Sequence, residues 1–254
     1  MTALFRTELR RLLARRLFRW LTSLVLLGFV VAAVVAFLQS GDDVGSTPFR
    51  FEQMETRLVE LSGLLVVIGW VVGASAIGAE WPHRTIPALL TWEPRRSRVL
   101  LAKLLAACVV AFLLAVFLEA AFTAVFLPAG QWRGTFAGID ASWWVDTVST
   151  AARIAGVAAF GAAAGFSLAA IGKNTAAALG AGFVYLAIVE TMVRVYRPEW
   201  LRWLIGDNMS HVLTAGEGFG GPGHSVAMSA LILAGYAAGV SLLGLWFFRR
   251  REMA

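Results

Sequence analysis

The stretch WLTSLVLLGFVVAAVVAFL, residues 20–38, contains no charged side chain and decides the fold class of the chain. An α-helix rises about 1.5 Å per residue, so a run of this length is about as long as the hydrocarbon core of a bilayer is thick, roughly 30 Å. Its apolar residues are continuous rather than alternating with polar ones, which is typical of a membrane-spanning helix and not of a barrel strand. The stretch therefore predicts a transmembrane helix.

The rest of the chain has the same character. Of its 254 residues, 59% are hydrophobic and only 15% are charged, and the mean hydropathy is +0.73. A soluble domain would carry more charge on its surface. We therefore predict an integral membrane protein, and the single cysteine, Cys108, excludes an intrachain disulfide.

Apolar continuity, limited by Gly, Pro and charged residues, predicts six spans. The fold class expected is therefore an all-α, polytopic membrane protein with one transmembrane domain over residues 1–254. The predicted spans are at about 20–38, 58–78, 99–126, 147–170, 175–195 and 226–247.

Glycines recur four residues apart in three of these spans, a spacing that lets helix backbones approach closely. We favour packing within one subunit over a dimer face for each of them. The pairs are Gly69 with Gly73, Gly161 with Gly165, and Gly235 with Gly239.

The basic residues indicate the orientation of the spans. Six crossings put both termini on one side, together with segment 79–98 and the turn at 171–174. Fifteen of the 22 Lys and Arg residues lie on that side, which the positive-inside rule assigns to the cytoplasm. We expect a multi-pass protein of the cytoplasmic membrane with both termini cytoplasmic, an extracytoplasmic loop at 197–225, and no nucleic-acid partner for the net charge of +6.

Residues 2–19 have the pattern of an amphipathic helix. Phe5, Leu9, Leu12 and Leu13 share one face at helical spacing, and arginines occupy most of the rest. We predict an interfacial helix on the cytoplasmic leaflet, in contact with membrane lipids. A signal peptide is disfavoured because the charged region is long and no small-residue cleavage site follows.

Several motifs that suggest chemistry lack the context that the chemistry needs. The sequence GEGFGG at 216–221 follows no strand, and IGKNT at 171–175 has asparagine where a phosphate-binding loop needs Ser or Thr. The three histidines, His83, His211 and His224, have no metal-ligand spacing. We expect this chain to have no catalytic, cofactor or metal site of its own.

Five charged residues of the predicted spans are expected near the outer face, and helical rise places all of them except Arg194 at similar depth. They are Glu60, Glu119, Arg153, Glu190 and Arg194. Opposite charges suggest that Glu119 or Glu60 pairs with Arg153, and that Glu190 pairs with Arg194 at i, i+4. Two hypotheses remain open, a static layer of ion pairs and an extracellular gate that opens when the pairs part.

A short helix is predicted at 85–92, inside cytoplasmic segment 79–98. Thr85 is a suitable N-cap, Leu89 and Leu90 form an apolar face, and Pro94 follows the helix. A helix of about two turns is unstable alone in water. It therefore needs a surface to hold it, either the membrane or a groove on a partner protein.

These residues carry a family resemblance. The order is Glu80, Thr85, the Leu89-Leu90 pair, Pro94, an arginine cluster and Lys103, placed between the second and third of six spans. This arrangement resembles the permease subunit of type-2 ATP-binding-cassette (ABC) transporters. One departure is Arg84, which stands where the family usually has glycine.

The resemblance implies that residues 85–92 are a coupling helix that docks on a separate nucleotide-binding subunit. Leu89 and Leu90 would be its apolar anchors, beside Thr85. Glu80 would be the acid at the end of the span, and Arg95 and Arg96 would contact the ATPase or lipid phosphates. ATP and Mg would then be bound by the partner ATPase and not by this chain.

The function expected from this resemblance is that of a non-catalytic, membrane-spanning permease subunit of an ATP-driven exporter. It would dimerise with a second copy or a paralogue, recruit ABC-type ATPase subunits, and move a hydrophobic or amphiphilic substrate such as a drug, peptide or lipid outward. The alternatives are an intramembrane enzyme, and an ATPase-driven membrane anchor or mechanical transmitter without a transported substrate.

Overall fold

The computed structural model describes residues 2–40, 48–81, 95–217 and 223–250. The predicted coupling helix, with Thr85, Leu89 and Leu90, lies outside these residues. Six of the described helices are long and apolar enough to cross a membrane, which confirms the prediction of an all-α polytopic membrane protein. They are Arg16–Gln39, Phe51–Gly78, Ser97–Arg133, Ala141–Gly172, Thr175–Tyr196 and Val226–Arg250.

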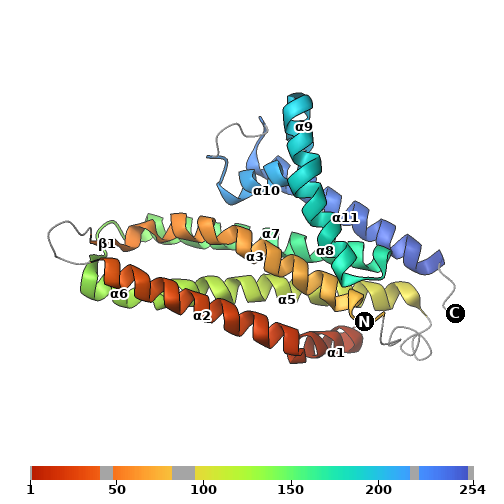
Figure 1. Cartoon of the computed structure of the whole chain (residues 1–254), viewed down its shortest axis with the longest axis horizontal. Helices are drawn as coiled ribbons and strands as arrows, with labels where there is room; N and C mark the ends of the chain where they lie inside the picture. Colours follow the sequence, from red (N-terminus) through yellow and green to blue (C-terminus); the bar gives the residue numbers. More distant parts are fainter. Residues whose placement is uncertain (1, 41–47, 82–94, 218–222, 251–254) are drawn as a thin grey trace.

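The long helices lie side by side along the molecule, and the fifth span rises across them (Figure 1). The long helices are α2 (Arg16–Gln39), α3 (Met54–Gly78), α5 (Arg96–Val125), α7 (Ala141–Gly172) and α11 (Val226–Arg250). The fifth span consists of α8 (Thr175–Val184), a π-helical turn η2 (Tyr185–Val189) and α9 (Glu190–Tyr196).

Shorter elements occur at the chain start, at the ends of the second and third spans, and before the sixth span. They are α1 (Thr2–Ala14), η1 (Phe51–Gln53), α6 (Leu127–Arg133), η3 (Pro198–Trp203) and α10 (Ile205–Leu213). Two described two-residue strands, β1 (Phe49–Arg50) and β2 (Gly134–Thr135), pair in parallel. Helix α1 and the end of α11 lie at one end of the long helices, and α6 and β1 at the opposite end (Figure 1).

The centre of the fold is the contact between α3 and α7. A Cβ atom added to Gly69 would lie 2.2 Å from the carbonyl oxygen of Ala158, and one added to Gly73 would lie 2.0 Å from that of Ala162. Only glycine allows backbones to approach so closely. These contacts are within one chain, whereas added Cβ atoms at the glycine pair of α11 would meet nothing within 4 Å.

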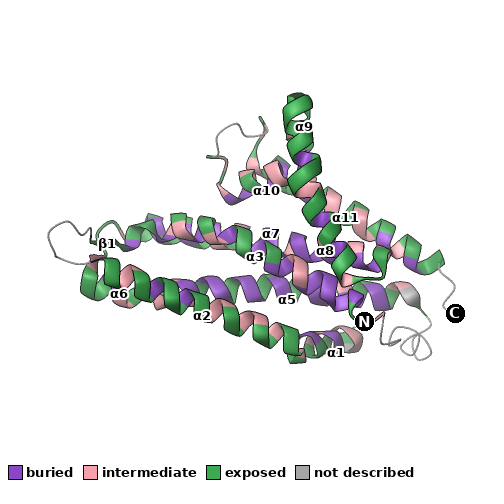
Figure 2. Ribbon diagram, viewed as in Figure 1, coloured by how far each residue is buried: buried purple, intermediate pink, exposed green. Residues whose placement is uncertain are grey.

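Burial divides the spans into two groups. The second, third and fourth spans are mostly buried inside the molecule, whereas the first, fifth and sixth are mostly exposed, as the exposed surface of α9 illustrates (Figure 2). Leu24, Phe183 and Leu242 are examples of large apolar side chains that point outward from the exposed group. In a bilayer such faces meet either lipid or another helix.

The predicted amphipathic segment 2–19 is divided in the structure. Helix α1 ends at Ala14, and Arg15 has an extended backbone with φ −64° and ψ 137°. The chain then turns into α2, whose first residues are the last part of the predicted segment. Leu12 is buried against the bundle and Leu13 is exposed. Which leaflet α1 contacts stays a prediction.

The first turn of α7 is capped by Asp140, outside the span. Its carboxylate accepts hydrogen bonds from the Trp143 amide (2.9 Å) and the Ser142 hydroxyl (2.7 Å). These bonds favour the ionised form and hold the pKa of Asp140 below its ordinary value. The carboxylate therefore stabilises the helix start at neutral pH, and this contribution is lost as the pH falls through the lowered pKa.

We expect Asp140→Ala to increase hydrogen exchange at the Trp143 amide at neutral pH, because the cap is removed. Acidification through the lowered pKa of Asp140 should likewise reduce the protection factor of this amide in the wild-type protein, measured against the intrinsic exchange rate at each pH. Asp140→Asn is the matched control, since asparagine caps helices without titrating. It should keep the protection and lose its acid sensitivity. Equal exchange in the wild type and Asp140→Ala would contradict this role.

Candidate functional site

Four charged side chains form a connected cluster at the end where α1 meets the feet of α3 and α5. We name Glu8, Arg15, Glu80 and Lys103 the basal ion network. The Lys103 Nζ atom lies 2.8 Å from a carboxylate oxygen of Glu8 and 2.8 Å from one of Glu80. Arg15 lies 3.2 Å from the same oxygen of Glu80. The network therefore joins α1, the start of α2, α3 and α5.

The network is largely removed from solvent. Lys103 is 2% exposed, Glu8 4% and Glu80 9%. Buried charges are costly unless they are paired, and here Lys103 and Arg15 face the carboxylates of Glu8 and Glu80, with the more exposed Arg11 3.4 Å from Glu8. Burial lowers the pKa of the Arg15 guanidinium below its ordinary value, and the carboxylates of Glu80 and Glu8 oppose that shift. The balanced charge explains how the cluster is tolerated.

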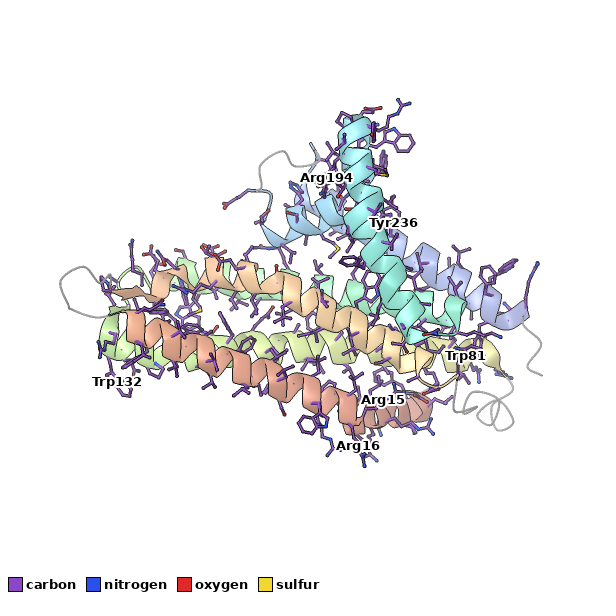
Figure 3. All side chains as sticks on the ribbon, viewed as in Figure 1. Arg15, Arg16, Trp81, Trp132, Arg194 and Tyr236 are labelled. Carbon is purple, nitrogen blue, oxygen red and sulfur yellow. The ribbon has the colours of Figure 1, made fainter. Side chains whose placement is uncertain are left out.

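Arg15 also satisfies the end of α3. Its guanidinium donates to the carbonyl oxygens of Ser75 and Ala76, which lie in the last turn of that helix. Carbonyls in the last turn of a helix have no partner within the helix. The extended backbone at Arg15 therefore directs this side chain onto α3, as seen beside the α1–α2 junction in Figure 3.

The position of the network in the chain is informative. Glu80 lies two residues before segment 82–94, and Lys103 follows that segment in the first turns of α5. Both residues belong to the sequence resemblance, but sequence reasoning missed Glu8 and Arg15. One available signal was that Glu8 is the single acidic residue among the six arginines of segment 2–19.

A second contact ties the same end together. Trp81 packs edge-on against Phe248 of α11, with ring centroids 6.2 Å apart. The Lys173 ammonium lies 4.9 Å from the centre of the Trp81 ring. Lys173 has a left-handed backbone, φ 53°, at the turn between α7 and α8. The end of α3 is thus fixed to both later parts of the chain that sequence analysis placed on the same side.

Glu190 and Arg194, both on α9, lie close together. Glu190 is 1% exposed and accepts a hydrogen bond of 2.8 Å from the Gly206 amide. Arg194 lies 3.6 Å from Glu190 and 2.9 Å from Asp207. These contacts clamp α9 to α10.

The structure does not bring Glu119 or Glu60 into an ion pair with Arg153. Arg153 donates to the Thr150 hydroxyl (2.6 Å), which itself donates to Glu55 (2.8 Å). Glu60 is exposed, and the buried Glu119 carboxylate has no hydrogen-bond partner among the described residues. Helical rise predicts depth only, whereas pairing also requires that the side chains share a face. The gate hypothesis stays a prediction.

The two described histidines connect α10 to the start of α11. His224 lies 3.2 Å from the Asn208 side-chain oxygen and 3.1 Å from the Ser229 hydroxyl, and His211 contacts the His224 carbonyl oxygen at 2.9 Å. Asn208 and Ser229 are fully buried. In the part of the chain that the structure describes, no group of three His, Cys, Asp or Glu side chains could hold a metal ion.

Comparison with known families decides the class of the protein. Residues 4–189 match the profile of a family described as "ABC-2 family transporter protein", which is well over half of the chain. The chain belongs to the ABC-2 transporter family. A search of curated proteins found no match.

Membership confirms the resemblance inferred from the sequence and points to a permease, a transport subunit rather than a catalytic enzyme. It also implies, in general, association with an ABC-type ATPase. The matched region contains the whole basal ion network of this ABC-2 protein. Of the predicted coupling residues, Glu80 lies in that network, Arg95 is exposed, and Arg96 begins α5.

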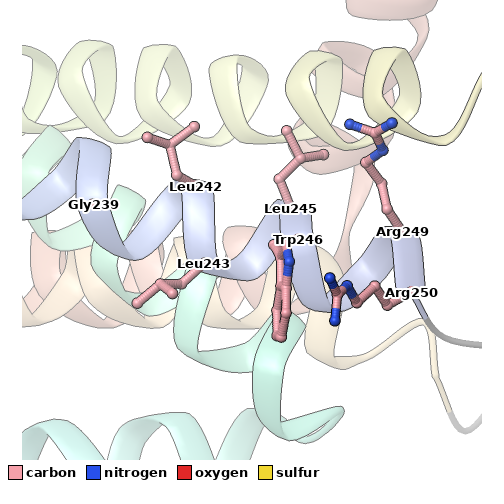
Figure 4. Close-up of a pocket in the computed structure, with 7 residues that line it drawn as sticks. All are labelled: Gly239, Leu242, Leu243, Leu245, Trp246, Arg249 and Arg250. Atoms are coloured by element: carbon pink, nitrogen blue, oxygen red, sulfur yellow. The ribbon is translucent and has the colours of Figure 1, made fainter.

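The last turns of α11 in this ABC-2 protein border a surface pocket of about 810 Å³. Figure 4 shows that its lining comes from one helix, with Leu242 and Trp246 followed by Arg249 and Arg250. The Arg250 guanidinium lies 4.2 Å from the centre of the Trp246 ring. An aromatic residue beside arginines at the end of a span is typical of the membrane interface.

Proposed function

We propose that this chain is the membrane-spanning permease subunit of an ATP-driven exporter in the cytoplasmic membrane. Its segment 79–98 would face the cytoplasm together with both termini, and the coupling helix at 85–92 would dock on an ABC-type ATPase. ATP and Mg would bind to that ATPase. The observation that carries this proposal is the basal ion network. In it, Lys103 contacts both Glu8 of α1 and Glu80, so the residues on either side of segment 82–94, the coupling segment, are joined to each other and to α1.

The network suggests how force would pass into the membrane. Glu80 and Lys103 lie on either side of the coupling segment, and the Lys103 ammonium links Glu80 to Glu8 of α1 through contacts of 2.8 Å each. A displacement of the segment would therefore move α3, α5 and α1 as one unit. Buried ion pairs resist separation because an unpaired charge would remain in an apolar surrounding.

Dimerisation is supported by the exposed apolar faces of the first, fifth and sixth spans. We propose that a second copy or a paralogue packs on part of this surface and that lipids cover the rest. The cargo pathway would lie between the two copies. An apolar pathway suits a hydrophobic or amphiphilic cargo, such as a drug, peptide or lipid, moved outward.

Co-purification tests the proposal directly. We expect the full-length protein to retain an ABC-type ATPase, for which the product of an adjoining gene with a phosphate-binding loop is the first candidate. Leu89→Ala combined with Leu90→Ala should reduce the retained ATPase by roughly tenfold or more, because buried apolar anchors dominate such interfaces. Leu105→Ala, on the exposed surface of α5, is the matched control.

If the wild-type protein retains no ABC-type ATPase, the transport proposal fails. If the Leu89 and Leu90 variant retains as much as the control, the coupling helix lies elsewhere. ATP-dependent efflux from vesicles then separates the exporter from a mechanical transmitter, which would hydrolyse ATP with its partner and move no cargo.

A further inference from the structure

An open groove of about 770 Å³ lies between α5 and α7, in the half of the bundle away from the basal ion network. The two helices run side by side there (Figure 1). Large apolar side chains line the groove, including Phe112 and Val116 of α5 and Trp144 and Val148 of α7. Its volume lies within the roughly 300–1,000 Å³ that is typical of small-molecule sites.

One acidic residue is among those that line this apolar groove, and its carboxylate oxygens are buried just beneath the surface. Glu119 lines it and is only 3% exposed, and neither of its carboxylate oxygens has a hydrogen-bond partner among the described residues. The Thr147 hydroxyl lines the same groove, and it too is buried and without a partner in the described structure. Two neighbouring elements thus present unused polar groups to one apolar space.

Glu119 differs from the other buried acids that the structure describes. Glu8 and Glu80 contact Lys103, and Glu190 accepts a hydrogen bond from the Gly206 amide. A buried carboxylate without such a partner is strongly destabilising in an apolar surrounding. Intramembrane carboxylates of this kind are functional candidates, and the missing partner has to be a cation or a hydrogen-bond donor.

We propose that this groove binds the positively charged head of an amphiphilic cargo, with Glu119 as its counter-charge. The Thr147 hydroxyl lies at the head, and the apolar body of the cargo lies along Phe112 and Val116. The Trp144 ring adds a face suited to a cation. The assignment rests on the proposed transport function and narrows the cargo class to hydrophobic monocations.

Equilibrium binding of radiolabelled tetraphenylphosphonium to the purified full-length chain tests this site. The uncharged detergent dodecyl maltoside is used, because it supplies no competing cation. We expect saturable binding that Glu119→Gln weakens by roughly tenfold or more and Glu119→Asp largely preserves. Thr147→Val should weaken it less. Glu60→Gln is the matched control, since Glu60 is exposed and does not line the groove.

Three results would overturn the proposal: unchanged affinity in Glu119→Gln, equal binding of the uncharged triphenylphosphine oxide, or full displacement by equimolar phosphatidylethanolamine, which would make the occupant a lipid. If Glu119→Gln does not fold, Thr147→Val and the uncharged analogue still decide. ATPase co-purification is measured on the same samples. If the protein retains the ATPase but binds no cation, only this site is refuted. If it binds the cation but retains no ATPase, only the transport function is refuted.

Discussion

Replacing Lys103 with methionine is expected to destabilise the protein by up to about 3 kcal/mol, at the lower end of the cost of breaking a buried ion pair, because Arg11 still contacts Glu8 and Arg15 still contacts Glu80. Lys103 is 2% exposed and is the shared partner of Glu8 and Glu80. Methionine keeps the length of the apolar stem, so the lost ammonium dominates the effect. Denaturant unfolding of the purified protein in detergent measures the free energy.

Arg98→Met is the matched control for this prediction. Arg98 lies on the same helix, also carries one positive charge, and is exposed. Its replacement should change the free energy of unfolding by less than about 0.5 kcal/mol. Adding Glu8→Gln to Lys103→Met should recover part of the lost stability, because one of the two side chains that lost Lys103 then carries no charge. Equal free energies of unfolding for Lys103→Met and Arg98→Met would show that the basal ion network does not stabilise the protein.

The same variants distinguish a structural role from a coupling role. The triple variant Glu8→Gln, Glu80→Gln, Lys103→Met leaves Arg15 as the one charge of the network, where it still donates to the Ser75 and Ala76 carbonyl oxygens, and we expect it to be closer to the wild type in stability than Lys103→Met alone. If the network transmits movement of the coupling segment, the triple variant should still bind the ATPase but lose ATP-dependent transport. Normal transport in a stable triple variant would make the network purely structural.

The spans could be predicted from the sequence because hydrophobic length alone decides them. Each crossing needs about 20 apolar residues, and no other soluble or membrane structure uses such runs. The break at Arg15 could not be predicted, since the amphipathic pattern of residues 2–19 continues across it. The break results from tertiary contacts, in which Arg15 reaches the last turn of α3 and Glu80.

The candidate site could be predicted from the sequence only in part, for a related reason. Glu80 and Lys103 flank the coupling segment and were found through the family pattern, whereas Glu8 lies 95 residues from its partner Lys103. For Arg153, depth along the helix suggested an acidic partner, but its contacts are with Thr150 and its neighbours on α7. Depth follows from sequence position, whereas the direction of a side chain follows from how the helices pack.

The α3–α7 contact leads to the second large expected effect. Gly73→Ala should destabilise the protein by about 1–3 kcal/mol or more, the range for overpacking in a close-packed core. The new Cβ would lie 2.0 Å from the Ala162 carbonyl oxygen, and Cβ atoms essentially never come within 3.0 Å of such a neighbour. Because the atom that it meets belongs to the backbone, no side chain can rotate away, and the two helices must move apart.

Gly63→Ala is the control that makes this prediction sharp. It is the same substitution on the same helix, but its Cβ would meet nothing within 4 Å. Alanine favours a helix over glycine by roughly 0.5–1 kcal/mol, so Gly63→Ala should leave stability unchanged or raise it slightly. Unfolding of both purified variants in one detergent measures the difference. Opposite signs follow only if Gly73 faces α7 and Gly63 does not, so similar effects from both would contradict the packing at the centre of this fold.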